Sequence, residues 1–385
     1  MASRRARGLN PVDLTLIDKA WRLNWPLVVL LSAVAAIGVV MLYSAGGGSL
    51  QPWSSRHLVR FALCVGLMLS LAFVDLRVWL KLAYPAYALG LVLLVAVEVA
   101  GMVGMGAQRW LDVGPIQIQP SEIMKIALVL ALARYFHGIT SEEAGRVLYV
   151  IPPTLMVLLP VGLVVKQPDL GTAVLMLAAG GALFFVAGVR LWKFALVFAG
   201  IGAAMPVLWG MMREYQRNRV LTFIDPERDP LGTGYHILQS KIAMGSGGMF
   251  GKGFLEGSQS HLNFLPEKQT DFIFTMLAEE FGMVGCLALL ALYSLIILIA
   301  ISIALRSQSL FGRMMAMGIA VIFFLYVFIN VAMVTGLIPV VGIPLPLVSY
   351  GGTAMLSVMI GMGMLMGVDI HRDMRLGRHG EALTS

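Results

Sequence analysis

Long apolar stretches separated by short polar segments make up most of the chain, and they predict membrane-spanning helices. A helical span needs roughly 20 apolar residues, and shorter spans are tolerated in buried positions. Ten stretches fit this pattern, at about 25–44, 57–74, 78–100, 121–137, 148–165, 170–187, 191–211, 271–305, 313–338 and 350–369. The stretch at 271–305 is longer than a bilayer requires, so we expect this helix to tilt or its ends to project.

The polar segments complete an all-α polytopic membrane protein, with one transmembrane domain at 25–369 and short tails at 1–24 and 370–385. Two loops are long, at about 101–120 and at about 212–270, the second between helices 7 and 8. Loops of such length are uncommon without a function. The second contains the amphipathic run YHILQSKIAM, which is suited to the membrane surface. No internal repeat is visible, which disfavours a transporter built from duplicated halves.

Composition and charge agree with this architecture and orient it. Hydrophobic residues make up 58% of the chain and charged residues 13%, a balance that excludes an ordinary soluble protein. Most Lys and Arg of the tails and short loops fall on the side of both chain ends. The short loops of the other side hold only Arg56, Arg60, Arg109 and Lys166. Both ends are therefore expected to be cytoplasmic, with the long loops outside. The net charge of +7 requires no nucleic-acid partner.

Several common kinds of site are not indicated by the sequence. Cys64 and Cys286 lie in apolar spans and are best interpreted as small core residues. The segment GSGGMFGKG at 245–253 lacks the spacing of a nucleotide-binding loop, and its glycines more simply permit a tight or flexible loop near a bulky substrate. No His and Cys cluster has metal-ligand spacing, and no serine-hydrolase motif is present.

The strongest candidate for chemistry is FLPEKQTDFIFTMLAEEFG at 264–282, where a polar loop enters a long apolar helix. Asp271 stands at this junction, close in sequence to Lys268. One interpretation is a helix cap by Thr270 or Asp271. The other is a general base, because partial desolvation at an apolar rim raises the pKa of a carboxylate and makes it a better proton acceptor.

A second candidate is QPSEIMK at 119–125. Glu122 and Lys125 are three residues apart, which puts both charges on one helical face. They could form an internal ion pair in a capped helix, or they could face a polar cavity, as charges within membranes usually do. Lys125 and nearby Arg109 are also candidate contacts for a diphosphate.

Two further segments are less decisive. In KQPDLGTA, Lys166 and Asp169 lie in a tight exterior turn, which could be only a turn with a helix cap. The run PLPLVSYGG, which contains Ser349, interrupts the chain before the last helix, either as a simple re-entrant cap or as a place where backbone closely approaches a ligand. Glu98 has no partner that the sequence reveals.

Together these segments resemble the SEDS family (shape, elongation, division and sporulation), and within it the RodA-like members more than the FtsW-like ones. The resemblance covers nearly the whole chain. It is carried by motifs in the family's order, namely GAQRWLDVG, QPSEIMK, KQPDLGTA, RVLTFIDPERDPLGTGYHILQSKIAMGSGGMFGKG, HLNFLPEKQTDFIF, AEEFG and PLPLVSYGG.

The resemblance implies a ten-helix peptidoglycan glycosyltransferase of the bacterial cytoplasmic membrane that polymerises lipid II into glycan strands on its outer face during elongation. The family's proposed catalytic aspartate falls on Asp271, and its buried charged pair on Glu122 and Lys125. The implied partners are a class B penicillin-binding protein, which supplies the transpeptidase, other elongation-complex membrane proteins, lipid II and the undecaprenyl-linked glycan.

The chemistry so implied is an inverting displacement of undecaprenyl diphosphate, with Asp271 as the base. The candidates for stabilising the departing diphosphate are Arg109, Lys125 and Lys166. A divalent cation, Mg or Mn, is the candidate cofactor at the diphosphate. The full set of candidate substrate-binding residues is Arg109, Glu122, Lys125, Lys166, Asp169, Lys268 and Ser349.

Three alternatives stay open at this point. The intramembrane charges fit a flippase for lipid-linked sugars equally well, although a flippase has no need of the large outer loop ending at Asp271. A scaffold that only organises partner proteins predicts that removing these charges has no effect on function. A division polymerase of the FtsW-like type differs in the complex that recruits it.

Overall fold

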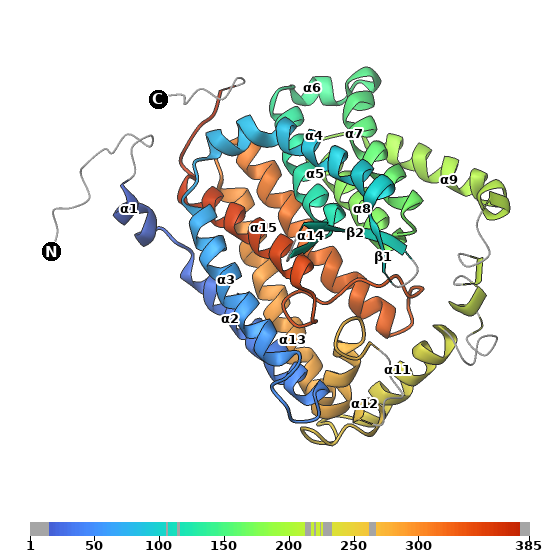
Figure 1. The fold of residues 1–385 in the computed structure, drawn as a ribbon. Helices are drawn as coiled ribbons and strands as arrows, with labels where there is room; N and C mark the ends of the chain where they lie inside the picture. The colour runs from blue at the N-terminus through green and yellow to red at the C-terminus, as the bar shows by residue number, and fades with distance from the viewer. Residues whose placement is uncertain are drawn as a thin grey trace.

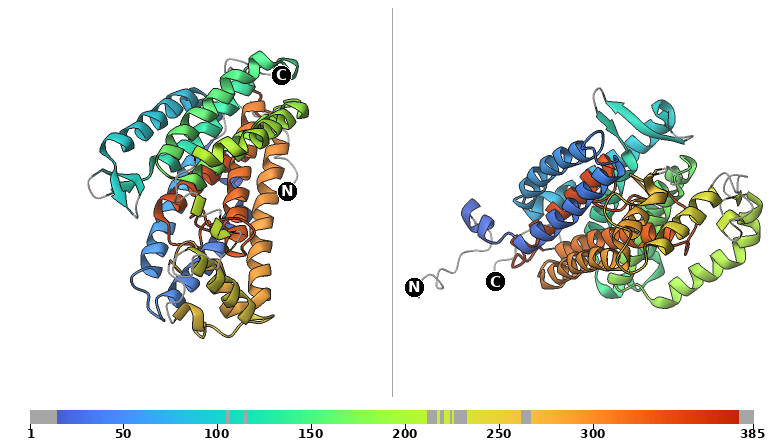
Figure 2. Two further views of the ribbon diagram at one scale, coloured as in Figure 1. Left: turned by 90° about the vertical axis from the view of Figure 1, so that its right-hand side faces the viewer. Right: turned by 90° about the horizontal axis from the view of Figure 1, so that it is seen from below.

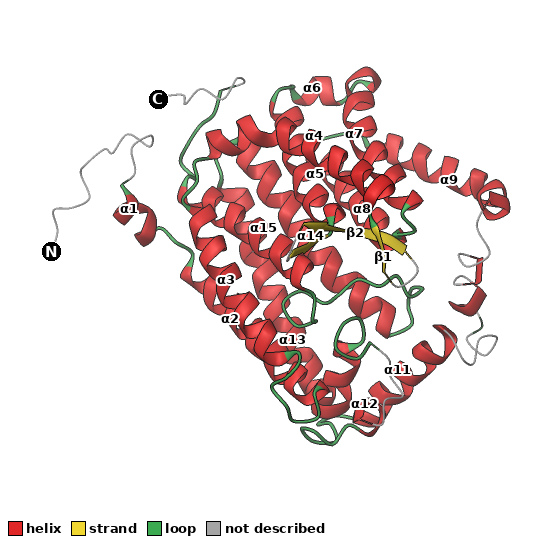
Figure 3. Ribbon diagram, in the orientation of Figure 1, coloured by secondary structure: helices red, strands yellow, loops and turns green. Residues whose placement is uncertain are grey.

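The structure is a computed structural model that describes residues 15–104, 107–113, 116–211, 217–218, 221–223, 225, 233–261 and 267–377. Helices dominate it and pack side by side into one bundle (Figures 1 and 3). A helix occupies each predicted span: α2 (Trp25–Ala45), α3 (Ser54–Ala72), α4 (Leu76–Ala100), α5 (Pro120–His137), α7 (Val147–Lys166), α8 (Leu170–Val186), α9 (Leu191–Met211), α13 (Ile273–Arg306), α14 (Leu310–Val334) and α15 (Gly352–Ile370). The chain is thus an all-α polytopic membrane protein.

Within the described ranges, seven of these helices are long and apolar enough to cross a membrane. The other three are α5, α8 and α9, and two of them, α8 and α9, contain shorter apolar stretches. Helix α5 carries Glu122, Lys125 and Arg134 in only 18 residues. It is nevertheless central, because α4, α14 and α8 pack around it. That all ten helices cross the membrane stays a prediction.

Helix α13 is long because it consists of two helices joined at a break. Gly282 interrupts it with φ 64° and ψ −160°, backbone angles that are accessible to glycine. The glycine-rich segment 245–253 lies against this break, where the amides of Gly253 and Met283 donate to the carbonyls of Glu280 and Gly248 at 3.1 and 3.0 Å. A Cβ on Gly251 would lie 2.0 Å from the Glu280 oxygen. The glycines therefore form a tight loop, one of the two expected alternatives, and it packs on α13. That this loop lies near a substrate stays a prediction.

The loop at 101–120 departs from the predicted all-α class. It contains an antiparallel sheet in the order β1 (Met102–Gly104), β2 (Ala107–Val113) and β3 (Ile116–Ile118). The strands are rich in Val, Ile and Trp, which favour extended backbone. Figure 3 shows this small sheet beside the helical bundle, so the all-α class holds with this one local correction.

The described part of the loop at 212–270 contains α11 (Thr233–Gly247) and α12 (Ser258–His261). The amphipathic run at 235–244 is helical, as its pattern indicates, and one face of α11 packs on α13 and α14. Ser240 is fully buried there, with its hydroxyl 2.7 Å from that of Thr275 and donating to the Val334 carbonyl at 2.8 Å. Leu238 and Ile242 on the other face are exposed. Contact of this face with the membrane surface stays a prediction.

The segment between α14 and α15 runs back into the bundle without regular structure, as expected for a re-entrant segment. The His57 ring nitrogen Nε2 lies 3.0 Å from the Leu347 carbonyl, and the Tyr293 hydroxyl donates to the Pro346 carbonyl at 2.6 Å. Gly38 on α2 allows this approach, because a Cβ there would lie 2.5 Å from the Leu347 oxygen. Irregular backbone at membrane depth is tolerated when protein surrounds it in this way.

The two described ends of the chain meet on one side of the bundle. Helix α1 (Leu16–Trp21) precedes Arg22, which forms a 3.0 Å ion pair with Asp373. Asn24 donates to Asp369 at 3.0 Å. Both ends therefore lie on the same side, as the prediction requires, and the assignment of that side to the cytoplasm stays a prediction. On the far side of the molecule α9 extends away from the bundle (Figures 1 and 2).

Candidate functional site

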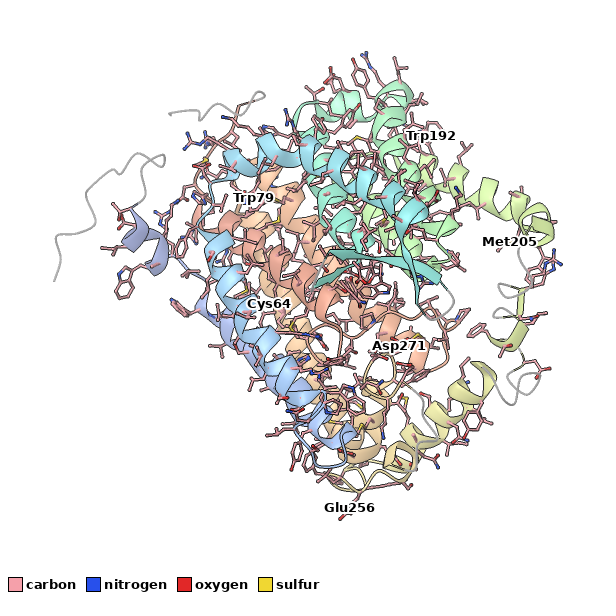
Figure 4. All side chains as sticks on the ribbon, viewed as in Figure 1. Cys64, Trp79, Trp192, Met205, Glu256 and Asp271 are labelled. Carbon is pink, nitrogen blue, oxygen red and sulfur yellow. The ribbon has the colours of Figure 1, made fainter. Side chains whose placement is uncertain are left out.

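Asp271 lies in a turn of residues 267–272 that leads into α13. Helix α13 begins at Ile273 with Phe272 at its N-cap, and the Phe272 side chain makes no capping hydrogen bond. The Thr270 hydroxyl donates instead to the Glu267 carbonyl at 3.1 Å. The N-cap position is therefore Phe272 and not Thr270 or Asp271, and a contact of the Asp271 carboxylate with the first turn of α13 stays one of the two interpretations. Figure 4 shows Asp271 well within the outline of the molecule, whereas Glu256 of the same outer loop lies at its lower edge.

Bonds to main-chain groups hold this turn in place. The Ser349 hydroxyl donates to the Thr270 carbonyl at 2.6 Å, and the Tyr350 amide donates to the Gln269 carbonyl at 2.8 Å. From α14, Asn330 Nδ2 donates to the Asp271 carbonyl at 3.0 Å. The structure therefore places Ser349 directly at the Asp271 turn, where it supports the backbone.

The Asp271 carboxylate is half-buried and borders the re-entrant segment. Gly342, with φ 72°, lies beside it, and a Cβ on Gly342 would be 3.5 Å from Asp271 Oδ2. Lys268 stands in the same turn and is also half-buried. Burial lowers the pKa of the Lys268 ammonium from its usual range. The turn of residues 267–272 thus carries a carboxylate, Asp271, and an amine, Lys268, and both are partly shielded from water.

Glu122 and Lys125 form the ion pair that their spacing predicted, deep between α5, α14 and α15. Lys125 Nζ lies 2.7 Å from Glu122 Oε1, and both side chains are at least nine-tenths buried. The Tyr326 and Ser357 hydroxyls donate to Glu122 Oε2 at 2.7 and 2.5 Å. Lys125 also donates to the Tyr326 hydroxyl. Every charged atom of the pair has a protein partner, which favours a supporting role over direct contact with a diphosphate.

Arg109 and Asp169 meet at the start of α8. Arg109 Nη1 lies 3.8 Å from Asp169 Oδ1, and its guanidinium donates to the carbonyls of Gln167 and Pro168. Asp169 is the N-cap of α8, accepting from the Thr172 amide at 3.4 Å. The turn-and-cap interpretation of this motif is confirmed, and the Arg109 side chain binds the carbonyls of the turn.

These groups belong to one connected region. Gln119 Nε2, one turn before Glu122, lies 3.4 Å from Asp169 Oδ2. Tyr326, which binds Glu122, is one helical turn before Asn330, which binds the Asp271 carbonyl. The structure therefore links Arg109, Glu122, Lys125, Asp169, Lys268 and Ser349 to Asp271 through shared neighbours.

Lys166 does not join this region through its own contacts. Its ammonium forms a 2.7 Å ion pair with Glu98 Oε2, and its side chain is 70% exposed. The same contact supplies the partner of Glu98 that the sequence did not reveal. In the structure Lys166 is therefore the most peripheral of the candidate residues.

Sequence reasoning missed a second buried carboxylate network. Glu279 and Glu280, from the AEEFG motif, are almost fully buried just before the break in α13. Glu279 Oε1 accepts from Lys252 Nζ at 2.8 Å and from the Gln259 amide at 2.9 Å, and Glu280 accepts from the Ser44 hydroxyl. Two adjacent carboxylates in an apolar helix were the available signal, because buried charges require partners.

Tyr326, Ser357 and Asn330 were also missed as members of the site. Tyr326 and Asn330 are four residues apart on α14, and Ser357 lies on α15. The i, i+4 spacing of the first two was the available signal, because it puts both side chains on one helical face. Among the residues that the structure places, no group of three or more His, Cys, Asp or Glu side chains is arranged to hold a metal ion.

Comparisons with known proteins agree with this architecture. Residues 24–374 match the FtsW/RodA/SpoVE family, described as cell cycle protein. The chain is 44% identical over 374 residues to the peptidoglycan glycosyltransferase MrdB of Escherichia coli K12, covering 95% of this chain and 98% of MrdB. It is 37% identical over 358 residues to stage V sporulation protein E of Bacillus subtilis, covering 89% and 95% of the two chains.

Two solved structures are similar to the whole fold. One is a chain from a study of how a peptidoglycan synthase complex coordinates polymerization and crosslinking, with TM-score 0.78 and 34% identity, covering 91% of this chain and 98% of that chain. The other is the rod shape determining protein RodA of Thermus thermophilus, with TM-score 0.66 and 32% identity, covering 91% and 97%. By the extent of these matches, the chain belongs to the FtsW/RodA/SpoVE family of cell cycle proteins.

Proposed function

We propose that this protein is a peptidoglycan glycosyltransferase of the bacterial inner membrane that joins lipid II units into glycan strands during cell elongation. Its relatives of known name include peptidoglycan glycosyltransferases. The observation that carries the proposal is the position of Asp271. Its carboxylate borders Gly342, and its turn is held through main-chain groups at the start of α13.

In the proposed reaction a sugar hydroxyl of the acceptor lipid II attacks the anomeric carbon of the growing strand. The bond from that carbon to undecaprenyl diphosphate breaks, and the anomeric configuration inverts in a transition state with oxocarbenium character. Asp271 accepts the proton of the attacking hydroxyl. Help from one general base is worth about 10²–10⁴-fold in rate.

The departing diphosphate requires positive charge near Asp271. Lys268 is the first candidate for this role, because it is a half-buried lysine in the same turn as Asp271. Arg109 is the second candidate, since its side chain is 28% exposed above the Asp169 turn. Glu122 and Lys125 would support the helices around the site without contacting the diphosphate. Lys166 would affect the diphosphate only through its distant charge.

A divalent cation is proposed as a further aid to the diphosphate. Magnesium is commonly held by one or two carboxylates together with substrate phosphates and waters. Because Asp271 is assigned to the attacking hydroxyl, on the opposite face of the anomeric carbon, the diphosphate oxygens and waters would supply most of the ligands of this cation. The cation would neutralise charge on the leaving group.

The proposed partner is a class B penicillin-binding protein that cross-links the strands. Support comes from the similarity to a chain of a complex in which polymerization and crosslinking are coordinated. Other elongation-complex membrane proteins would localise the pair. Such a division of labour requires the outer loop and the Asp271 turn to lie on the outer face of the membrane.

The test is strand polymerisation from purified lipid II in liposomes, with the class B partner present, using wild type and Asp271→Asn. Asparagine keeps the size of the side chain but cannot accept the proton, so we expect the rate to fall by about 10²–10⁴-fold. Glu256→Gln is the matched control, because it also removes one carboxylate from the outer loop, at its exposed edge.

The outcomes separate the proposal from its rivals. Normal polymerisation by a folded Asp271→Asn protein would remove Asp271 from the role of base. No polymer from wild type, with lipid II crossing the liposome membrane, would favour the flippase. A scaffold would show neither activity, while Asp271→Asn would leave partner binding unchanged.

A further inference from the structure

Asn330 holds a special place on α14, because its side chain joins the two irregular segments that border the site. Its Nδ2 donates to the carbonyl of Asp271 at 3.0 Å and to the carbonyl of Ile343 at 2.7 Å. The first carbonyl belongs to the turn that carries the carboxylate. The second follows directly on Gly342, the residue that faces Asp271 Oδ2. One amide group thus fixes both sides of the space beside the carboxylate.

Rigid support surrounds this amide. Asn330 is fully buried, and α14 is among the most buried helices of the bundle. One turn earlier, Tyr326 is fixed by Glu122 and Lys125. The Asn330 amide group therefore extends from a well-packed helix, whereas residues 267–272 and most of the re-entrant segment lie outside regular helices.

The same side chain is poorly suited to a purely stabilising role. Asn330 Oδ1 is buried and accepts no hydrogen bond from the part of the chain that the structure describes. Leaving a buried acceptor unsatisfied opposes stability. An apolar residue here would avoid that cost but would release both carbonyls.

We infer that Asn330 is a positioning residue, which sets the place of the Asp271 carboxylate by fixing the Asp271 and Ile343 carbonyls. The inference rests on the proposed role of Asp271 as base. Asn330 does not contact substrate in this role. It acts by keeping the carboxylate and the backbone at Gly342 at a fixed separation.

The first experiment measures kcat and KM for lipid II polymerisation by Asn330→Ala. A displacement of about 1 Å at a reacting group can reduce turnover by about 10²-fold, so we expect kcat to fall by 10-fold to 10²-fold with KM changed much less. Thr335→Ala is the control on the same helix, because the Thr335 hydroxyl donates only to carbonyls of α14 itself, at Val331 and Ala332. Its kcat should stay within about twofold of wild type.

The decisive readout is a double-mutant cycle with Asp271→Glu, which keeps a carboxylate but moves it. If Asn330 acts through Asp271, Asn330→Ala should reduce kcat much less in the Asp271→Glu protein than in wild type. If Asn330→Ala reduces kcat by the same factor in the Asp271→Glu protein as in wild type, the inference is overturned, because a general structural role would affect both proteins equally. Asn330→Asp, which nearly preserves size, replaces the alanine variant if the latter does not fold.

The failure of this inference and of the proposed function are distinguishable. Wild-type kcat in Asp271→Glu and Asp271→Asn would remove the base and, with it, the role of Asn330. Loss of activity in the Asp271 variants together with wild-type kcat in Asn330→Ala would overturn the positioning role alone.

Discussion

Two regions of this protein hold charged side chains in place through different kinds of contact. The Glu122–Lys125 pair is enclosed by Tyr326 and Ser357, so its charges are neutralised by side chains on three helices. The Asp271 turn is held through main-chain carbonyls and amides that Ser349, Tyr350 and Asn330 contact. The first region is thus held through its charged groups, and the second through its main chain. With the proposed role of Asp271, we expect the first region to fix the arrangement of the helices and the second to hold the base.

The strongest test of this comparison removes one of the two charges of the Glu122–Lys125 pair. Glu122→Gln leaves the Lys125 ammonium buried without a counter-charge, which typically costs about 3–5 kcal/mol. We expect a strong loss of thermal stability in detergent, measured as the midpoint of unfolding.

The matched control for that prediction is the double variant Glu122→Gln with Lys125→Met, which removes both charges at similar volume. It should regain much of the stability, because replacing a buried ion pair by neutral groups is often nearly neutral. If the double variant is stable but has no measurable polymerisation, the pair takes part in the chemistry and the contrast between the regions is wrong.

A smaller effect should come from Gly342→Ala at the open side of Asp271. The φ of 72° at Gly342 makes any side chain unfavourable by about 1–2 kcal/mol, and the new Cβ would touch the carboxylate region. We expect the polymerisation rate to fall roughly tenfold, as for a small displacement of a reacting group.

Gly188→Ala provides the comparison for Gly342→Ala. Gly188 also has a positive φ, of 88°, but a Cβ there meets no atom within 4 Å. Both variants should lose similar stability, and only Gly342→Ala should lose polymerisation. Equal rates in the two proteins would show that the space beside Asp271 need not stay open.

The smallest effect is expected at the periphery. Lys166→Gln breaks an ion pair with Glu98 in which the Lys166 side chain is 70% exposed, and exposed pairs contribute about 0–1 kcal/mol. Stability and polymerisation should stay close to wild type. A severalfold rise in KM for lipid II would instead place Lys166 on the diphosphate side, as the sequence first suggested.

The sequence predicted the parts of the fold that depend on local pattern. Apolar stretches located the helices to within a few residues, and the i, i+3 spacing predicted the Glu122–Lys125 pair. Tyr326 and Ser357 complete that pair from positions 204 and 235 residues away, and no local pattern reports such distant contacts.

The Asp271 turn shows the same limit in another form. The carboxylate itself was evident, because a charge at the edge of an apolar helix is unusual. Its supports act on main-chain carbonyls, which every residue type carries, so residue identity could not reveal which carbonyls are bound. The break at Gly282 was hidden likewise, because one glycine among many gives no sign of its φ.

The re-entrant segment before α15 also has a consequence for biogenesis. Its partners His57, Gln269, Thr270, Tyr293 and Asn330 all precede it in the chain. During synthesis the Asp271 turn therefore emerges well before Ser349 and Tyr350, which later support it. A chain released before this segment would contain the proposed base but lack these supports. Synthesis from the N-terminus thus delays assembly of the site until the segment between α14 and α15 has been made.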